Sequence, residues 1–311
     1  MTAVLERQEG LAQIEVDGEP CFAYPRLTGP VALGDEVIVN TQARDLGLGS
    51  GGFDVLYANL TRGLGLPAEG DAHVMQLPYT PGQIAVRHAE EDGQTAGDLQ
   101  GMPVVCCSVH SQVASVVAAL GGLRVAYVQL GGGALPLTLS DTVRLLKERG
   151  LIGLSVAVAP CFGGDVDCVT AWSALLHVAG HGFDVAVCAI GPGIVGTATD
   201  FGHGGMAAAT AANAATALGG RPVVALRISE ADRRERHRGI SHHTAAVLHA
   251  CLGDVTVAGK GDGEGWREAC EGLPLSHMGR DADEDPAFFE SAYAAGRAAR
   301  ALVGEIESAR P

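Results

Sequence analysis

The sequence lacks several features that would assign it to a familiar class. No stretch of about twenty apolar residues is present, so a membrane-spanning helix is not expected. The first residues, MTAVLERQEG, have no basic start followed by an apolar run, which argues against a signal peptide and favours a cytoplasmic location. No two of the eight cysteines form a CxxC pair, so we expect reduced, mostly buried thiols and neither a zinc finger nor a redox dithiol.

Positive charge is also scarce. Lys and Arg number 21 against 36 Asp and Glu, which gives a formal net charge of −15. Such a surface repels phosphate backbones and anionic lipids, so neither a nucleic acid nor a membrane is expected as a partner. A local concentration of arginine therefore stands out. The segment Arg227–Thr244, RISEADRRERHRGISHHT, holds five arginines and three histidines.

Two regions differ in their hydrophobic period. Short apolar runs alternate with turn residues from Leu11 to Leu60, which predicts a small antiparallel β-domain. From Pro103 onward, apolar strands alternate with helix-length segments, as in α/β proteins, and strands such as VAVCAI are apolar on both faces. We therefore predict a small N-terminal β-domain plus linker over residues 1–100. Residues 101–311 are predicted to form a doubly wound, mainly parallel, Rossmann-like α/β domain with a C-terminal helix.

The α/β pattern predicts six strands and six helices. The strands are expected at Val104–Ser108, Arg124–Gln129, Ser155–Ala159, Asp184–Ile190, Pro222–Ile228 and Asp254–Ala258. The helices are expected at Ser111–Leu120, Ser140–Arg149, Asp167–Ala179, Gly205–Leu218, Ser241–Cys251 and Pro286 to about Ser308, the last after a solvated acidic stretch, Asp281–Asp285. Ligands in such sheets bind at the carboxyl ends of the strands, so the turns that follow each strand are the candidate sites.

The segment Arg227–Thr244 is the strongest candidate, because it follows a buried strand and leads into a helix. Arginine offers a planar fork of donors for phosphate or carboxylate, and a helix beginning after Ser241 offers free backbone N–H groups. The predicted anion-binding residues of this segment are Arg227, Arg234, Arg236, Arg238, Ser241 and Thr244. The alternative is a solvated charged face in which some of the arginines form weak surface ion pairs.

Histidines of the same segment are the candidate proton carriers. We predict that His242 or His243 transfers a proton and that Asp165 orients it. Neighbouring positions on a helix point about 100° apart, so the two histidines are not expected to ligate one metal ion together. A divalent metal could instead be held by His203, one of these histidines and Asp165 or Asp167, and its identity is unknown.

Other turns could line the same site with glycine backbone and polar side chains. The candidates are His110, Ser111, Gly132, Gly133, Gly164, Gly191, Gly193, Gly196, Thr197 and the solvent-facing His203. The segment GPGIVG matches the dinucleotide-binding pattern GxGxxG. The next helix, however, is expected to start several residues after this segment. Arg227 also occupies the position where an acidic residue would bind the ribose. NAD is therefore not expected, and a phosphate or carboxylate cradle is favoured. Cys161 could be a nucleophile, but a small residue in a tight turn is the favoured interpretation.

Five motifs in a fixed order resemble a known grouping. They are YTPGQ (Tyr79–Gln83), GGALPL (Gly132–Leu137), FGGD (Phe162–Asp165), GPGIVGT (Gly191–Thr197) and RERHRGISHHT (Arg234–Thr244). Together they resemble the uncharacterised bacterial "domain of unknown function" family thirty-eight sixty-six, from the N-terminal β-region to about Ala258. The resemblance implies no activity, because the reaction of that family is unassigned. Cys161 does not belong to the family pattern, which weakens it as a nucleophile.

Three functions are compatible with these observations. The leading hypothesis is an enzyme that performs hydrolysis or group transfer on a small anionic metabolite, phosphorylated or nucleotide-like. The second is a non-catalytic sensor whose α/β domain binds a metabolite while its β-domain contacts a partner. The third is a scaffold without a ligand, in which the Arg/His segment would be paired internally. A homodimer is compatible with each of them.

Overall fold

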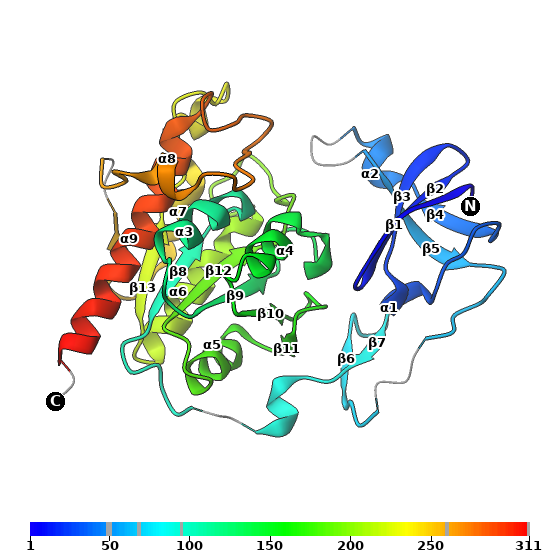
Figure 1. Cartoon of the computed structure of the whole chain (residues 1–311), viewed down its shortest axis with the longest axis horizontal. Coiled ribbons are helices and arrows are strands. Elements are labelled where there is room, and N and C mark those ends of the chain that lie inside the picture. The colour runs from blue at the N-terminus through cyan, green and yellow to red at the C-terminus, as the bar shows by residue number, and fades with distance from the viewer. Residues whose placement is uncertain (48–51, 67–69, 94–95, 259–260, 310–311) are drawn as a thin grey trace. The chain divides into compact units, whose positions relative to one another are not determined.

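The computed structural model describes residues 1–47, 52–66, 70–93, 96–258 and 261–309 (Figure 1). The chain divides into two compact units, Met1–Arg87 and His88–Pro311. Residues directly after the division belong to the second unit, because Glu90 accepts hydrogen bonds from the Val169 amide and the Ser173 hydroxyl. Among the described residues, no helix combines the length and apolarity that crossing a membrane requires.

The first unit is built around a five-stranded sheet with the strand order β1-β2-β3-β5-β4. Its strands are β1 (Ala3–Gln8), β2 (Leu11–Val16), β3 (Glu19–Ala23), β4 (Val37–Asn40) and β5 (Asp54–Asn59). The sheet is mixed, because β3 and β5 pair in parallel while the other pairs are antiparallel. Two short helices, α1 (Pro25–Thr28) and α2 (Gln42–Asp45), and a hairpin of β6 (Val74–Gln76) and β7 (Ile84–Val86) complete the unit.

The second unit contains a seven-stranded, fully parallel sheet with the order β11-β10-β9-β12-β8-β13-β16. Its strands are β8 (Pro103–Cys107), β9 (Val125–Leu130), β10 (Leu154–Val158), β11 (Val166–Cys168), β12 (Val185–Ile190), β13 (Arg221–Ala225) and β16 (Thr256–Val257). The predicted α/β class is confirmed. The short strand β11 was not predicted, and it delays the following helix to Ala171.

Helices cover both faces of this sheet, as the two-sided apolar strands predict (Figure 1). On one face lie α3 (Val113–Ala119), α4 (Asp141–Glu148) and α9 (Pro286–Ala309); on the other lie α5 (Ala171–Gly180), α6 (Ala207–Ala217) and α7 (His242–Ala250). Alternate residues of β8 serve the two cores, with Cys106 facing α6 and Cys107 facing α3. All eight cysteines are free, and seven are buried.

Shorter elements connect this framework. They are η1 (Ala89–Asp92), η2 (His110–Gln112), η3 (Leu137–Leu139), η4 (Gly204–Met206), β14 (Ile228–Ser229), η5 (Glu235–His237), β15 (Gly239–Ile240) and α8 (Trp266–Ala269). The strand predicted at Pro222–Ile228 therefore ends at Ala225, and Ile228 instead pairs with Ile240 in a separate two-stranded hairpin.

The connections leave the carboxyl edge of the sheet in opposite directions. The turns after β8 and β9 lead to α3 and α4 on one face, whereas those after β12 and β13 lead to α6 and α7 on the other. Because the strand order is β9-β12-β8-β13, neighbouring turns diverge all along this edge. In open α/β sheets, ligands bind where neighbouring connections diverge in this way.

Candidate functional site

The segment Arg227–Thr244 folds back on itself just beyond the carboxyl end of β13. The Arg227 amide donates to the Thr244 hydroxyl at 2.9 Å, and the Ser241 amide donates to the Arg227 carbonyl at 2.9 Å. Ser241 is the N-cap of α7, and its hydroxyl accepts from the His243 amide at 3.2 Å. The hydroxyls of Ser241 and Thr244 therefore hold the loop together.

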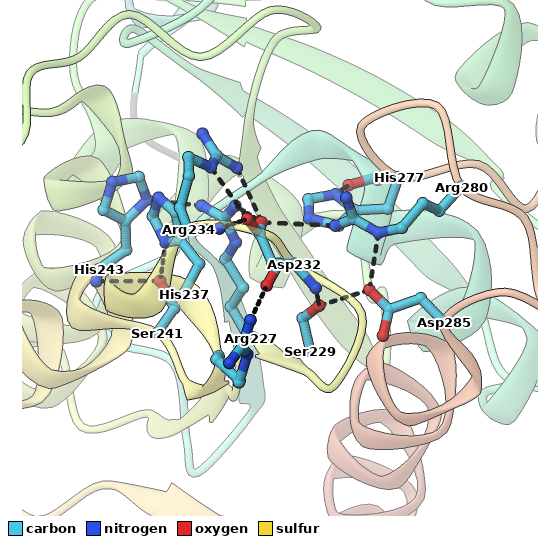
Figure 2. Close-up of polar contacts among 12 residues, drawn as sticks. Arg227, Ser229, Asp232, Arg234, His237, Ser241, His243, His277, Arg280 and Asp285 are labelled. Carbon is cyan, nitrogen blue, oxygen red and sulfur yellow. Dashed lines mark hydrogen bonds and ion pairs between the residues drawn. The ribbon is translucent and has the colours of Figure 1, made fainter.

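Three arginines surround the carboxylate of Asp232, and we call Arg227, Arg234 and Arg280 the arginine cluster (Figure 2). Arg234 donates two hydrogen bonds to this carboxylate, at 3.0 and 2.8 Å. Arg280 approaches it to 3.4 Å, and Arg227 only to 3.8 Å. Burial alone would raise the pKa of Asp232, but the hydrogen bonds and charge of Arg234 hold that pKa well below its ordinary value.

Arg227 is the least satisfied member of the arginine cluster. It is only 1% exposed, and its Nε has no hydrogen-bond partner. One of its terminal nitrogens, Nη1, donates to Nδ1 of His243 at 2.9 Å. Burial, followed by the charge of Arg234, lowers the pKa of Arg227 to about 10. Arg227 therefore shares the carboxylate of Asp232 with two other arginines. It does not reach this carboxylate at hydrogen-bond distance.

Four imidazoles pack beside Arg227, and we call His203, His237, His242 and His243 the histidine cluster. The rings of His203 and His243 stack with their centroids 3.7 Å apart, and those of His242 and His243 lie 4.5 Å apart. His203 is buried, so the expectation that it faces solvent was wrong. The antiparallel bridge between Gly196 and His203 brings it inward.

The expectation that neighbouring histidines do not share one metal ion stays a prediction, but the structure brings the rings of His242 and His243 close together. Each of His237, His242 and His243 offers a ligand atom, and these atoms lie within 4.8 Å of one another. The Cα–Cβ bonds of neighbouring residues diverge on a helix, but an imidazole extends far enough beyond Cβ for its ring to turn back. His237 reaches the same place from the turn before α7, which no helical spacing rule describes.

Burial favours the neutral form of each imidazole in the histidine cluster. Burial lowers the pKa of His237 to about 3 and that of His243 to about 2, and the charge of Arg227 adds to both effects. The pKa of His203 and that of His242 are lowered too, again first by burial. Both ring nitrogens of His242 are buried and have no hydrogen-bond partner among the described residues. Lone pairs in this cluster are therefore available to a ligand.

A loop far along the chain supplies further residues that the sequence analysis missed. Nδ1 of His277 lies 2.8 Å from the Ser111 hydroxyl, and the His277 ring stacks on Phe288 with centroids 3.8 Å apart. Burial and then the charge of Arg227 lower the pKa of His277 to about 3, and its Nε2 has no partner. Asp285 is buried and accepts hydrogen bonds from Ser229 and Arg280, so the solvated stretch predicted at Asp281–Asp285 was wrong at its last residue.

Asp165 does not join these residues. It lies next to Val166, at the start of β11, where its carboxylate accepts from the amide and hydroxyl of Ser155 and pairs with Lys147. Ser155 is in the amino-terminal half of β10, so Asp165 belongs to the opposite end of these strands from the histidine cluster. Gly164 beside it packs against strand backbone. Neither residue can act on the histidine cluster from this place.

The glycine turns at the carboxyl edge pack mainly against one another. A Cβ on Gly133 would collide with the Gly191 carbonyl, and one on Gly132 with Gly204. Gly193 lies in the same loop as Gly191 and adopts a positive φ, which allows a tight turn. These glycines let three turns approach closely, and their role in binding a ligand stays a prediction. Thr197 is exposed and bonds to its own loop.

The remaining predicted residues divide between structure and surface. His110 bonds Ser140 through Nε2 at 2.7 Å and the Ile190 carbonyl through Nδ1 at 3.2 Å, and burial lowers its pKa to about 4. It therefore ties three turns together. Arg236 and Arg238 are exposed beside the arginine cluster. Cys161 is buried, and burial raises its pKa to about 12, which is consistent with the small-residue interpretation.

Comparison with known proteins gives one match. The family model described as "Protein of unknown function (DUF3866)" matches residues 21–262, more than half of the chain, which confirms the resemblance drawn from the motifs. No curated protein and no solved structure matches the chain. The matched range holds the histidine cluster, Arg227, Asp232 and Arg234. It ends before His277, Arg280 and Asp285.

Proposed function

Because the chain belongs to the DUF3866 family, whose description states no activity, we propose its function from the site alone. The protein is an enzyme that binds a small anionic metabolite, phosphorylated or nucleotide-like, at the carboxyl edge of β8, β12 and β13. It performs hydrolysis or group transfer on that metabolite. The incomplete counter-charge around Arg227 is the observation that carries this proposal.

The charge balance of the site favours an anion. The arginine cluster holds three guanidinium groups, and among the described residues two buried carboxylates pair with it, Asp232 and Asp285. A buried charge is costly unless it is fully paired, so a bound phosphate or carboxylate would stabilise Arg227. The side chains of Arg234 and Arg280 are 36% and 18% exposed, so an anion from solvent can reach the cluster.

Unpartnered polar atoms argue against a scaffold without a ligand. Within the part of the chain that the structure describes, four buried nitrogens of the site have no hydrogen-bond partner: Nε of Arg227, both ring nitrogens of His242, and Nε2 of His277. Leaving such an atom unsatisfied costs about 1–3 kcal/mol, so buried polar atoms are normally paired with protein, water or ligand. Their concentration in one place supports a binding site.

Proton transfer in the proposed reaction requires an imidazole beside the bound anion. His242 and His243 are the candidates from the sequence, but Asp165, the residue predicted to orient them, lies elsewhere. His277 is better placed, because its hydrogen bond to Ser111 couples a base to a hydroxyl. Its pKa is low first because of burial and then because of Arg227. A bound anion would offset that positive charge and raise this pKa toward the working range.

Thermal unfolding of the full chain with inorganic phosphate or pyrophosphate tests the anion site. At a hundredfold excess over its Kd, a ligand stabilises by about 2.7 kcal/mol, which raises the melting temperature by several degrees. Arg227→Met should abolish this protection. Arg221→Met is the matched control, because Arg221 begins the same strand β13 and pairs with Glu305, and it should keep the protection. Equal protection of both variants would refute the assignment.

Mass spectrometry of a panel of phosphorylated metabolites and nucleotides incubated with the protein tests catalysis. An enzyme converts at least one compound that also protects the fold, and Ser111→Ala or His277→Gln lowers the rate. A sensor returns every protecting compound unchanged. If every protecting compound is returned unchanged, the proposal of an anion site stands and the proposal of a reaction is rejected.

A further inference from the structure

The histidine cluster has a geometry that anion binding does not explain. Three of its imidazoles, from η5 and the first turn of α7, offer ligand atoms within 4.8 Å of one another. We propose that His237, His242 and His243 form a binding site for a divalent transition metal, with Zn²⁺ as the expected ion. This inference goes beyond the proposed function and does not depend on it.

Two of the three imidazoles can each present a ring nitrogen to a metal ion. Nδ1 of His237 lies 2.7 Å from the Ser241 hydroxyl, which fixes the ring and leaves Nε2 for the metal (Figure 2). Metal-binding histidines commonly have their second nitrogen held by such a partner. His242 has no hydrogen bond at either nitrogen although both are buried, and coordination would satisfy one of them. Ser241 is thus a positioning residue for this site.

The third ligand is occupied by Arg227. Because Nη1 of Arg227 donates to Nδ1 of His243, that lone pair is in use and the proton of the neutral ring is on Nε2. Coordination through Nδ1 would displace the arginine, and coordination through Nε2 would move the proton to Nδ1, where it opposes the arginine N–H. Metal binding by His243 therefore releases Arg227 in either case. The released guanidinium would be free to donate to Asp232 or to an anion.

The donor set selects the kind of metal. Neutral imidazole nitrogens suit Zn²⁺, Co²⁺, Ni²⁺ and Cu²⁺, whereas Mg²⁺ and Ca²⁺ prefer oxygen ligands. Zinc bonds nitrogen at about 2.0–2.1 Å, so tetrahedral ligand atoms are about 3.3 Å apart, and these rings must move inward from their present separation. Three protein ligands leave the fourth tetrahedral position open, which is the pattern of catalytic rather than structural zinc.

Direct metal titration of the full chain tests the site. The metal is first removed with a chelator, and Zn²⁺ is then titrated against a colorimetric competitor, with Co²⁺ absorption as a second readout of coordination. His177 on α5 and His181, the C-cap residue of that helix, have ring centroids 4.0 Å apart, so this pair can bind metal independently. All proteins should therefore carry His177→Gln and His181→Gln.

We expect one tight equivalent of Zn²⁺ in this background. His237→Gln or His242→Gln should weaken it at least about a hundredfold, and Ser241→Ala about tenfold. Arg227→Met should bind Zn²⁺ as tightly or more tightly, because it removes a competing donor and a positive charge. Far-ultraviolet circular dichroism checks that each variant is folded. No tight equivalent, or unchanged affinity in a folded His242→Gln variant, would overturn the inference.

The two proposals can fail separately. Tight zinc binding without phosphate protection would keep the metal site and reject the proposed anion site. Phosphate protection without zinc binding would do the reverse. Arg227→Met separates them within one variant, because it is expected to lose phosphate protection and to retain zinc.

Discussion

Two buried carboxylates of this protein, Asp35 and Asp232, show how similar ion pairs can have different meanings. Asp35, in the first unit, accepts from Arg62 at 2.7 Å, from the Asn59 amide at 2.8 Å and from the Ala32 backbone amide at 2.8 Å. One arginine meets one carboxylate there, and neutral donors complete the set. Such a balanced pair is explained by its role in holding a turn in place.

Asp232, in the second unit, is surrounded by three arginines, one of them buried and only partly satisfied. Folding alone gives no reason to collect positive charge around a single carboxylate, because each added guanidinium costs desolvation. A buried ion pair therefore indicates function when its charges do not balance.

Asp232→Asn should produce the largest loss of stability. The substitution leaves three arginines without their shared carboxylate, and breaking a buried pair costs about 3–5 kcal/mol. Urea unfolding of the full chain, followed by the fluorescence of the tryptophans, measures the effect, since Trp172 and Trp266 are both in the second unit. Inorganic phosphate should recover part of the loss. A variant as stable as the wild type would remove the distinction between the two carboxylates.

Arg280→Met should weaken phosphate binding about tenfold, since one of three cationic partners is lost at a cost near 1.4 kcal/mol. Arg62→Met is the matched control, because Arg62 pairs with Asp35 in the balanced site. Phosphate titration of both variants makes the comparison. If Arg62→Met weakened binding as much as Arg280→Met, the effect would reflect net charge and not the arginine cluster.

The balanced pair should instead respond to acid. The hydrogen bond from Arg62 lowers the pKa of Asp35 to about 2 against a smaller opposing effect of burial. A lowered pKa stabilises the fold above the unfolded pKa, about 3.9, and this contribution disappears as the pH falls through 2. The rate of pepsin cleavage within residues 1–87 should therefore differ between wild type and Asp35→Asn at pH 4 and converge near pH 2. A constant difference would contradict the assigned pKa.

Asp165→Asn should have the smallest effect on function. Its carboxylate pairs with Lys147 and Ser155, away from the histidine cluster, and Lys147 and Asp165 are partly exposed. We expect a stability change of about 1 kcal/mol or less from the ion pair and unchanged phosphate binding. Loss of phosphate binding in a folded variant would restore the role in the site that the sequence suggested.

The periodicity of the sequence was sufficient for the architecture of the second unit. Strands apolar on both faces require helices on both sides, and the parallel sheet and its six main helices follow from that requirement. The position of Arg227–Thr244 after β13 was predictable for the same reason. The short strand β11 was not, because three residues leave no periodic signal, and its pairing is what carries Asp165 away from the site.

The partners of the arginine cluster were beyond prediction from local pattern. Arg280 and Asp285 lie in a charged stretch that has the composition of a solvated surface, but in the fold Asp285 is buried and Arg280 contacts Asp232. The convergence of His237 with His242 and His243 depends on a turn outside the helix, where spacing rules do not apply. Long-range packing and loop geometry decided both features.

Titration calorimetry with inorganic pyrophosphate at low salt measures binding at the arginine cluster itself. We expect one site in each chain of the wild type and of Arg221→Met, and no measurable heat with Arg227→Met. Binding of equal strength to all three proteins, or to none, would contradict the claim that the unbalanced charge at the end of β13 is there to hold an anion.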